Sequence, residues 1–206
     1  MRFFLVAAVT SLVLATSAFA ADTGPLATLK QKNGEVDRLL RTKTETGSPE
    51  EKRVKDGIKT LAGTLFDYNE LARRALADHW TPLTPAKRTE FVATLREIIE
   101  RNYVRQLRGN LNYQVQYKNE ELVGKEATVT SVVRVKTSGK ATDAEIVYKM
   151  LKPESNPTSW VVYDVITDEV SLVRNYRTQF GKVINEKGYD ELLRRMKSKL
   201  AEPNEK

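Results

Sequence analysis

The pattern of apolar and polar positions predicts helices in the first half of the chain. Between residues 26 and 103 apolar side chains recur at intervals of three and four, which is typical of amphipathic helices. Ser48, Asp67 and Thr84 each stand where a helix N-cap is expected, and two of them precede a proline suited to the first helical turn. The sequence therefore predicts several helices with well-marked starts.

After Gly109 the period changes from helical to alternating, which indicates strands. Four segments carry the alternation, at residues 111–117, 127–135, 144–150 and 160–166. The links between them are short, with a turn expected at residues 138–139 after the second segment. Short links favour an antiparallel meander over parallel strands, which need long crossovers.

The fourth strand leads through a turn at residues 167–169 into a helix, and a last helix is expected at residues 189–200. The helix after the turn has one apolar stripe: Val170, Val173, Tyr176 and Phe180. This order predicts an α+β fold with a curved four-stranded antiparallel sheet and N-terminal and C-terminal helices on one face. Such a cone or half-barrel can enclose an apolar cavity.

The first twenty residues have the pattern of a cleaved signal peptide. Arg2 precedes the apolar run 3–15, and the segment Ala-Phe-Ala at 18–20 resembles a cleavage site. The run is shorter than the roughly 18–20 apolar residues that a membrane span needs, which disfavours a membrane anchor. We therefore expect residues 1–20 to be removed and residues 21–206 to form a single exported domain.

Composition narrows the possible partners. The chain has no cysteine, so its core must stabilise it without disulfides, and 40% hydrophobic residues make this plausible. Its formal net charge is +7, with basic residues interspersed among acidic ones. In an exported protein this charge points to anionic lipid headgroups or an acidic protein rather than to nucleic acid.

The sequence offers little catalytic chemistry. A metal site built from Cys and His is excluded because the chain has no cysteine and only one histidine, His79. Gly124 and Gly139 are isolated turn glycines rather than a phosphate-binding loop. No nucleophile stands beside a base, so we assign no catalytic and no metal-binding residue.

Asp164 is an acidic residue in an otherwise apolar strand. An aspartate in an apolar cone can act as the base of a steroid-isomerase type of enzyme. The structural alternative is a carboxylate paired with Arg174 or Arg177 of the following helix, because an unpaired buried charge is costly. The residues alone leave both interpretations open.

Two groups of motifs are specific in combination. The first group is FDYxxLAxxAL at 66–76, HW at 79–80, TP at 84–85, and Arg88 with Phe91. The second group is Trp160, VYDV at 162–165, VSLV at 170–173, NYR at 175–177 and QF at 179–180. Together they run over nearly all of the exported chain and resemble the toluene-tolerance, or MlaC-type, periplasmic phospholipid-binding proteins. Glu169 departs from the pattern, since a small residue, usually glycine, is expected in that turn.

The resemblance implies an NTF2-like cone with extra helices, and a periplasmic carrier rather than an enzyme. Its cargo would be phospholipid, with no other cofactor. Its expected partners are an inner-membrane MCE-domain protein with an ABC transporter and an outer-membrane lipoprotein–porin complex. Such a carrier would move lipid between the two membranes and help maintain lipid asymmetry.

On this hypothesis the apolar inward stripes line the lipid cavity, with the headgroup at the mouth. The residues expected to contact lipid are Leu71, Ala75, Phe91, Leu95, Ile98, Val133, Ile146, Tyr148, Tyr163, Val165, Val173 and Tyr176. Two other functions remain open: a cone-fold isomerase or hydratase using Asp164, and a periplasmic scaffold or chaperone-like protein. The sequence leaves undecided the lipid class (a phospholipid or a hopanoid-like lipid), the direction of transport and the oligomeric state.

Overall fold

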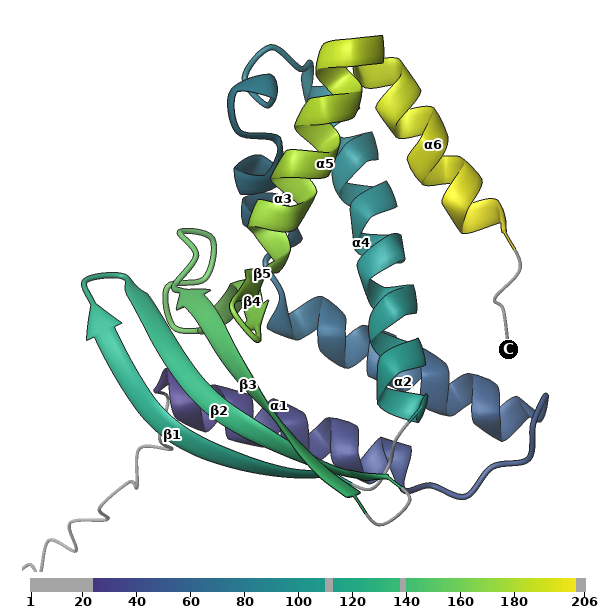
Figure 1. Cartoon of the computed structure of the whole chain (residues 1–206), viewed down its shortest axis with the longest axis vertical. Helices are drawn as coiled ribbons and strands as arrows, with labels where there is room; N and C mark the ends of the chain where they lie inside the picture. The colour runs from purple at the N-terminus through teal and green to yellow at the C-terminus, as the bar shows by residue number, and fades with distance from the viewer. Residues whose placement is uncertain (1–23, 110–112, 138–139, 203–206) are drawn as a thin grey trace, which may run out of the picture.

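The computed structural model describes residues 24–109, 113–137 and 140–202 of the 206-residue chain (Figure 1). The expected signal peptide and the expected turn at 138–139 lie outside the described residues. Within the described part, helices come first, then an antiparallel sheet, then two more helices. None of the described helices combines the length and apolar character that crossing a membrane would require.

The first half of the chain forms α1 (Pro25–Leu40), α2 (Pro49–Leu65), α3 (Tyr68–Leu76), the 3-10 helix η1 (Ala77–His79) and α4 (Pro85–Gly109). Of these, α2, α3 and α4 begin directly after the residues that the sequence marks as N-caps, Ser48, Asp67 and Thr84. The Ser48 hydroxyl accepts a hydrogen bond from the Glu51 N–H at 3.1 Å, and Asp67 Oδ1 accepts one from the Glu70 N–H at 2.9 Å. The predicted N-caps of α2 and α3 are therefore confirmed.

The sheet is five-stranded, antiparallel and ordered β1-β2-β3-β4-β5. Its strands are β1 (Tyr113–Val123), β2 (Glu126–Thr137), β3 (Lys140–Leu151), β4 (Val161–Thr167) and β5 (Val170–Ser171). The predicted α+β fold with an antiparallel meander is confirmed. The fifth strand is an addition, two residues long, and pairs only with β4.

The turn between β4 and β5 explains why the following helix starts later than expected. Asp168 and Glu169 have φ values of 46° and 68°, the left-handed conformation that a two-residue hairpin turn requires. The chain then pairs back onto β4, so Val170 belongs to a strand and is 61% exposed. Ser171 caps α5 by accepting a hydrogen bond from the Arg174 N–H at 3.0 Å.

Two helices complete the fold, α5 (Leu172–Lys187) and α6 (Tyr189–Ala201). Figure 1 shows a curved sheet, with α3, α4, α5 and α6 gathered beyond its β4 side and α1 running alongside the strands. The main core lies where these helices meet one end of the sheet, and its fully buried residues include Leu71, Phe91 and Val162. A smaller apolar cluster joins α1, α2 and α4 around Val36 and Ile58.

A β-bulge in β4 interrupts the alternation of that strand. Lys149 of β3 is opposite Asp164, whereas the next residue, Met150, is opposite Val162, so Tyr163 is the extra residue. As a consequence Val162 and Val165 both lie on the inner side of the sheet, the first in the core and the second at the cavity described below. Simple alternation along β4 predicts that Tyr163 and Val165 share one face of the sheet. For this pair the prediction is wrong.

Candidate functional site

A half-open cavity of about 860 Å³ lies between the curved sheet and the helices. Its sheet side consists of side chains from the inner faces of four strands: Tyr113, Val115, Tyr117, Val133, Val135, Ala144, Ile146, Tyr148, Val165 and Thr167. Its helix side comes from α1, the end of α2, the second half of α4 and the start of α5: Lys30, Asn33, Gly34, Val36, Asp37, Arg41, Leu65, Phe66, Ile99, Asn102, Tyr103, Leu172, Asn175 and Tyr176. Val170 of β5 completes the wall.

The sheet side is apolar because of the alternation that the sequence shows. Val115, Val133 and Ala144 are opposite one another on three neighbouring strands, so their side chains form one row across the sheet. The residues between them in sequence, such as Gln114 and Arg134, face the other side and are exposed. The inner face is therefore largely apolar, with a few hydroxyl groups, and the helices do not fill the space above it.

Five of the twelve residues expected to contact lipid lie on the cavity wall: Val133, Ile146, Tyr148, Val165 and Tyr176. Six others are buried in the packed core instead: Leu71, Ala75, Phe91, Leu95, Ile98 and Val173. Their helices pack directly on one another, as shown by the rings of Phe91 and Phe180, whose centroids are 5.6 Å apart. Lipid contact by any of the twelve remains a prediction.

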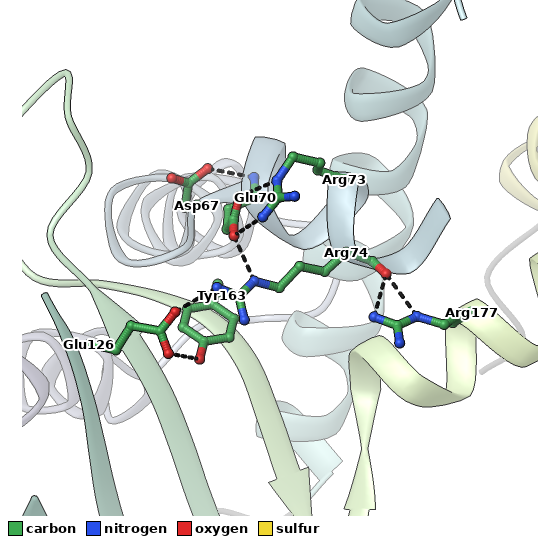
Figure 2. A network of polar contacts seen from close by, with 7 residues as sticks. All are labelled: Asp67, Glu70, Arg73, Arg74, Glu126, Tyr163 and Arg177. Atoms are coloured by element: carbon green, nitrogen blue, oxygen red, sulfur yellow. Dashed lines mark hydrogen bonds and ion pairs between the residues drawn. The ribbon is translucent and has the colours of Figure 1, made fainter. Parts of the chain in front are cut away.

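Tyr163, the twelfth residue, takes part in a polar network away from the cavity wall (Figure 2). Its hydroxyl donates a hydrogen bond to Glu126 Oε2 at 2.9 Å, and the Arg74 guanidinium carbon lies 3.8 Å from the centre of its ring. Arg74 also bonds Glu70 Oε1 at 2.6 Å and Glu126 Oε1 at 2.7 Å. Arg177 of α5 donates two hydrogen bonds to the Arg74 carbonyl, at 3.0 and 2.8 Å.

This network fixes the helices to the sheet away from the cavity wall. It joins α3 through Arg74, β2 through Glu126, β4 through Tyr163 and α5 through Arg177 (Figure 2). The hydrogen bond from Arg74 holds the pKa of the Glu126 carboxyl below its usual value, so that carboxyl is ionised at neutral pH. The bulge at Tyr163 thus serves the attachment of α3 and α5 rather than the cavity.

The cavity wall also contains polar side chains that the sequence reasoning did not single out. Asn33 of α1 donates a hydrogen bond to the Tyr117 hydroxyl at 2.7 Å, and the Tyr113 hydroxyl donates one to Asp37 Oδ1 at 3.2 Å. Burial raises the pKa of Tyr148 to about 12, so its hydroxyl stays protonated. The stripe of α1 is broken and gave no signal that this helix faces a cavity.

Asp164 is buried, outside the cavity wall, and serves as an anchor for α5. Its Oδ2 accepts a hydrogen bond from the Ser171 hydroxyl at 2.6 Å, and its Oδ1 accepts one from the Val173 N–H at 3.0 Å. These donors, rather than Arg174 or Arg177, satisfy the carboxylate. The alternative function as an isomerase or hydratase therefore lacks its proposed base in the cavity.

The described residues also hold no arrangement suited to a metal. No group of three or more His, Asp and Glu side chains among them lies close enough together to bind a metal ion. His79 is at the end of η1 and away from the cavity wall. What the site offers is an apolar wall with a few hydroxyl and amide groups, which suits binding of a large amphiphile.

Comparison with known proteins decides the family. The model of the MlaC protein family matches residues 30–198, most of the chain. The chain belongs to the MlaC family. The MlaC-type resemblance carried by the motifs at 66–91 and 160–180 is thereby confirmed.

Two MlaC-like relatives illustrate the likeness. A curated relative, the intermembrane phospholipid transport system binding protein MlaC of Haemophilus influenzae, is 21% identical over 194 residues, which cover 92% of this chain and 88% of the relative. A solved structure of a phospholipid-binding protein from Ralstonia solanacearum, in complex with a phospholipid, matches with a TM-score of 0.69 and 21% identity. That match covers 85% of this chain and 98% of the other, and at this identity it establishes a common fold for the MlaC family member described here.

Proposed function

We propose that this protein is a phospholipid carrier whose cavity shelters the acyl chains while the headgroup stays at the mouth. The observation that carries the proposal is the cavity of about 860 Å³ between the sheet and the helices. Ligand pockets usually measure roughly 300–1,000 Å³, so this one is near the upper end and suits a large apolar cargo. Membership of the MlaC family and the phospholipid bound by the Ralstonia relative support the same conclusion.

The energetics of a lipid carrier match such a cavity. Burying one methylene is worth about 0.8 kcal/mol, so a pair of sixteen-carbon chains represents roughly 25 kcal/mol. A carrier has to cover most of this surface, because otherwise the lipid stays in the bilayer. We assign this role to the apolar wall formed by Val115, Val133, Ile146 and Val165 with Tyr176 of α5.

The rim of the cavity carries polar and charged side chains that suit a polar headgroup but do not favour one headgroup type over another. Four exposed residues lie at its edge: Lys30 of α1 and the C-cap residue Arg41 on one side, and Thr167 and Asn175 on the other. Arg41 already bonds Asp37 at 2.7 Å, so its charge is partly neutralised. We therefore expect a tolerance for several headgroups.

In the envelope we propose a periplasmic shuttle between an inner-membrane MCE-domain protein with its ABC transporter and an outer-membrane lipoprotein–porin complex. The expected signal peptide at residues 1–20 and the name of the Haemophilus relative, an intermembrane phospholipid transport system binding protein, support this placement. The protein would act by binding alone, with phospholipid as cargo and no chemical step.

The test is to purify the protein from the periplasm and analyse it by native mass spectrometry and lipid extraction. A phospholipid bound at one molecule per cavity is the expected result. The same protein, stripped of lipid, should take up phospholipid from vesicles. Protein that arrives without lipid and takes up none would refute the proposed function.

A further inference from the structure

Part of the cavity wall is a belt of polar side chains across the otherwise apolar surface. We call this set the polar belt: the wall residues Asn33, Tyr103, Tyr117 and Tyr148, together with the fully buried Ser131, which forms a hydrogen bond with Tyr148. In the sheet, Tyr117 is opposite Ser131 on the neighbouring strand. Tyr148 is in the neighbouring row, opposite Val129 and Val165. The row on the other side of Tyr117, formed by Val115, Val133 and Ala144, is purely apolar.

The members of the polar belt come from both sides of the cavity and converge. Tyr103 projects from α4, and Asn33 projects from α1. Asn33, Tyr103, Tyr117 and Tyr148 line the same cavity, and Asn33 of the helix side donates a hydrogen bond to the Tyr117 hydroxyl of the sheet side at 2.7 Å. Burial raises the pKa of the Tyr103 phenol. The belt therefore spans the space between helices and sheet.

Some hydrogen-bond donors of the polar belt have acceptors within the protein and others do not. Ser131 Oγ donates to the Ile146 carbonyl at 3.4 Å, and Asn33 Nδ2 donates to the Tyr117 hydroxyl. The Tyr148 hydroxyl forms side-chain hydrogen bonds with Asn33 and Ser131. The Tyr117 hydroxyl accepts from Asn33, and among the described residues neither its proton nor the Tyr103 hydroxyl has an acceptor. Tyr113 differs, because its hydroxyl donates to Asp37.

Two unused hydroxyl donors in an apolar cavity define the ligand group that they fit. A lipid that fills the cavity would remove these hydroxyl groups from water, and a buried donor without an acceptor costs free energy. A hydrocarbon chain has no acceptor, whereas a diacyl lipid carries two ester carbonyl oxygens where its acyl chains begin. We propose that Tyr103 and Tyr117 donate hydrogen bonds to these ester carbonyls, so that the cavity selects ester-linked lipids.

This inference rests on the proposed function and specifies its substrate class. Ether-linked dialkyl lipids have the same headgroup and chains but no ester carbonyls. A hopanoid-like lipid has a rigid fused-ring hydrocarbon part and also lacks them. The polar belt therefore discriminates against both classes, even though either one could fill the apolar wall.

The experiment offers the lipid-stripped protein an equal mixture of diacyl and dialkyl phosphatidylethanolamine of matched chain length, presented in vesicles. Native mass spectrometry gives the ratio of the two complexes. One neutral hydrogen bond changes affinity by roughly two- to tenfold, so the wild-type protein should favour the diacyl lipid by at least that factor. Tyr103→Phe and Tyr117→Phe should each lower the ratio toward one while total uptake persists.

Tyr163→Phe is the matched control, because it removes a buried tyrosine hydroxyl that lies away from the cavity wall. Its ratio should equal that of the wild type. A wild-type ratio of one, or Phe variants that keep the full preference, would overturn this inference and leave the carrier function intact. Protein that takes up neither lipid would overturn the proposed function and this inference with it.

Discussion

The carboxylate of Asp164 provides a sharp test of the assignment as a carrier. It bonds the Ser171 hydroxyl and the Val173 N–H, one through each oxygen. Asp164→Asn keeps the shape of the side chain but replaces one oxygen with an amide that cannot accept a hydrogen bond. We expect this variant to lose stability and to keep its lipid uptake.

The magnitude follows from the two hydrogen bonds. A hydrogen bond to a charged group contributes about 1.5–3 kcal/mol and a neutral one about 1 kcal/mol, so the two bonds together lose about 2–3 kcal/mol. Loss of a negative charge next to the N-terminus of α5 adds about 0.3–1 kcal/mol. The free energy of unfolding should fall by about 3 kcal/mol, and at roughly 2–4 °C per kcal/mol the Tm should fall by about 6–12 °C.

The assay is chemical and thermal unfolding of the lipid-stripped protein, followed by phospholipid uptake at a temperature where the variant is folded. Asp190→Asn is the control, because Asp190 is an acidic residue in the first turn of α6 and is largely exposed, at 83%. Its ion pair with Lys87 is on the surface, so the control should stay within about 0.5 kcal/mol of the wild type.

Two results would contradict this reasoning. A Tm within about 2 °C of the wild type would show that the two hydrogen bonds do not anchor α5. The second result is a folded Asp164→Asn protein that loses lipid uptake, or that loses an enzymatic turnover found in the wild type. It would show that Asp164 takes part in function and not only in stability. The second result would favour the isomerase or hydratase alternative.

Three further predictions concern the cavity, the turn and the outer network. Ile146→Asp places a carboxylate on the apolar wall and should reduce lipid uptake at least tenfold in a folded protein. Val147→Asp, on the opposite face of the same strand, is the control and should not reduce uptake. Equal uptake by the two variants would show that Ile146 does not line the lipid site. Glu169→Gly relieves a left-handed φ of 68° and should raise the free energy of unfolding by about 0.5 kcal/mol, measured by urea unfolding. The lowered pKa of Glu126 stabilises the fold above pH 4.5, its usual value, and this contribution is lost as the pH falls through the lowered value. Arg74→Met should therefore show a smaller loss of stability between pH 7 and pH 3 than the wild type, and an unchanged loss would contradict the role of the network.

Much of the local structure could be predicted because its causes are local. A hydroxyl or carboxylate at Ser48 or Asp67 pairs with backbone N–H groups three residues later, whatever surrounds the helix. The alternation along β1, β2 and β3 likewise survives in the structure, because successive side chains of a strand must point to opposite faces. The starts of α2 and α3 and the order of β1 to β4 could therefore be predicted from the residues alone.

The conformation of β4 could not be predicted in this way. The bulge at Tyr163 depends on partners from other elements, since Arg74 of α3 and Glu126 of β2 hold the extra residue in place. The positive φ of Glu169 was signalled only as a departure from an expected glycine. Because Tyr163 is the extra residue, the positions before it face the side opposite to the one that alternation predicts. Alternation counted back from Val165 therefore put Tyr163 on the wrong face.

The sequence by itself determined which faces of the helices and strands are apolar, but only the tertiary structure decided what those faces meet. Phe91 and Val173 are as apolar as Val133 and Ile146, yet the first two are sealed in a core and the last two line a cavity. The physical reason is that burial in a core and exposure to an apolar cavity demand the same side-chain chemistry. A core and a cavity differ only in the distance between the opposing layers. Packing of the helices at one end of the sheet sets that distance.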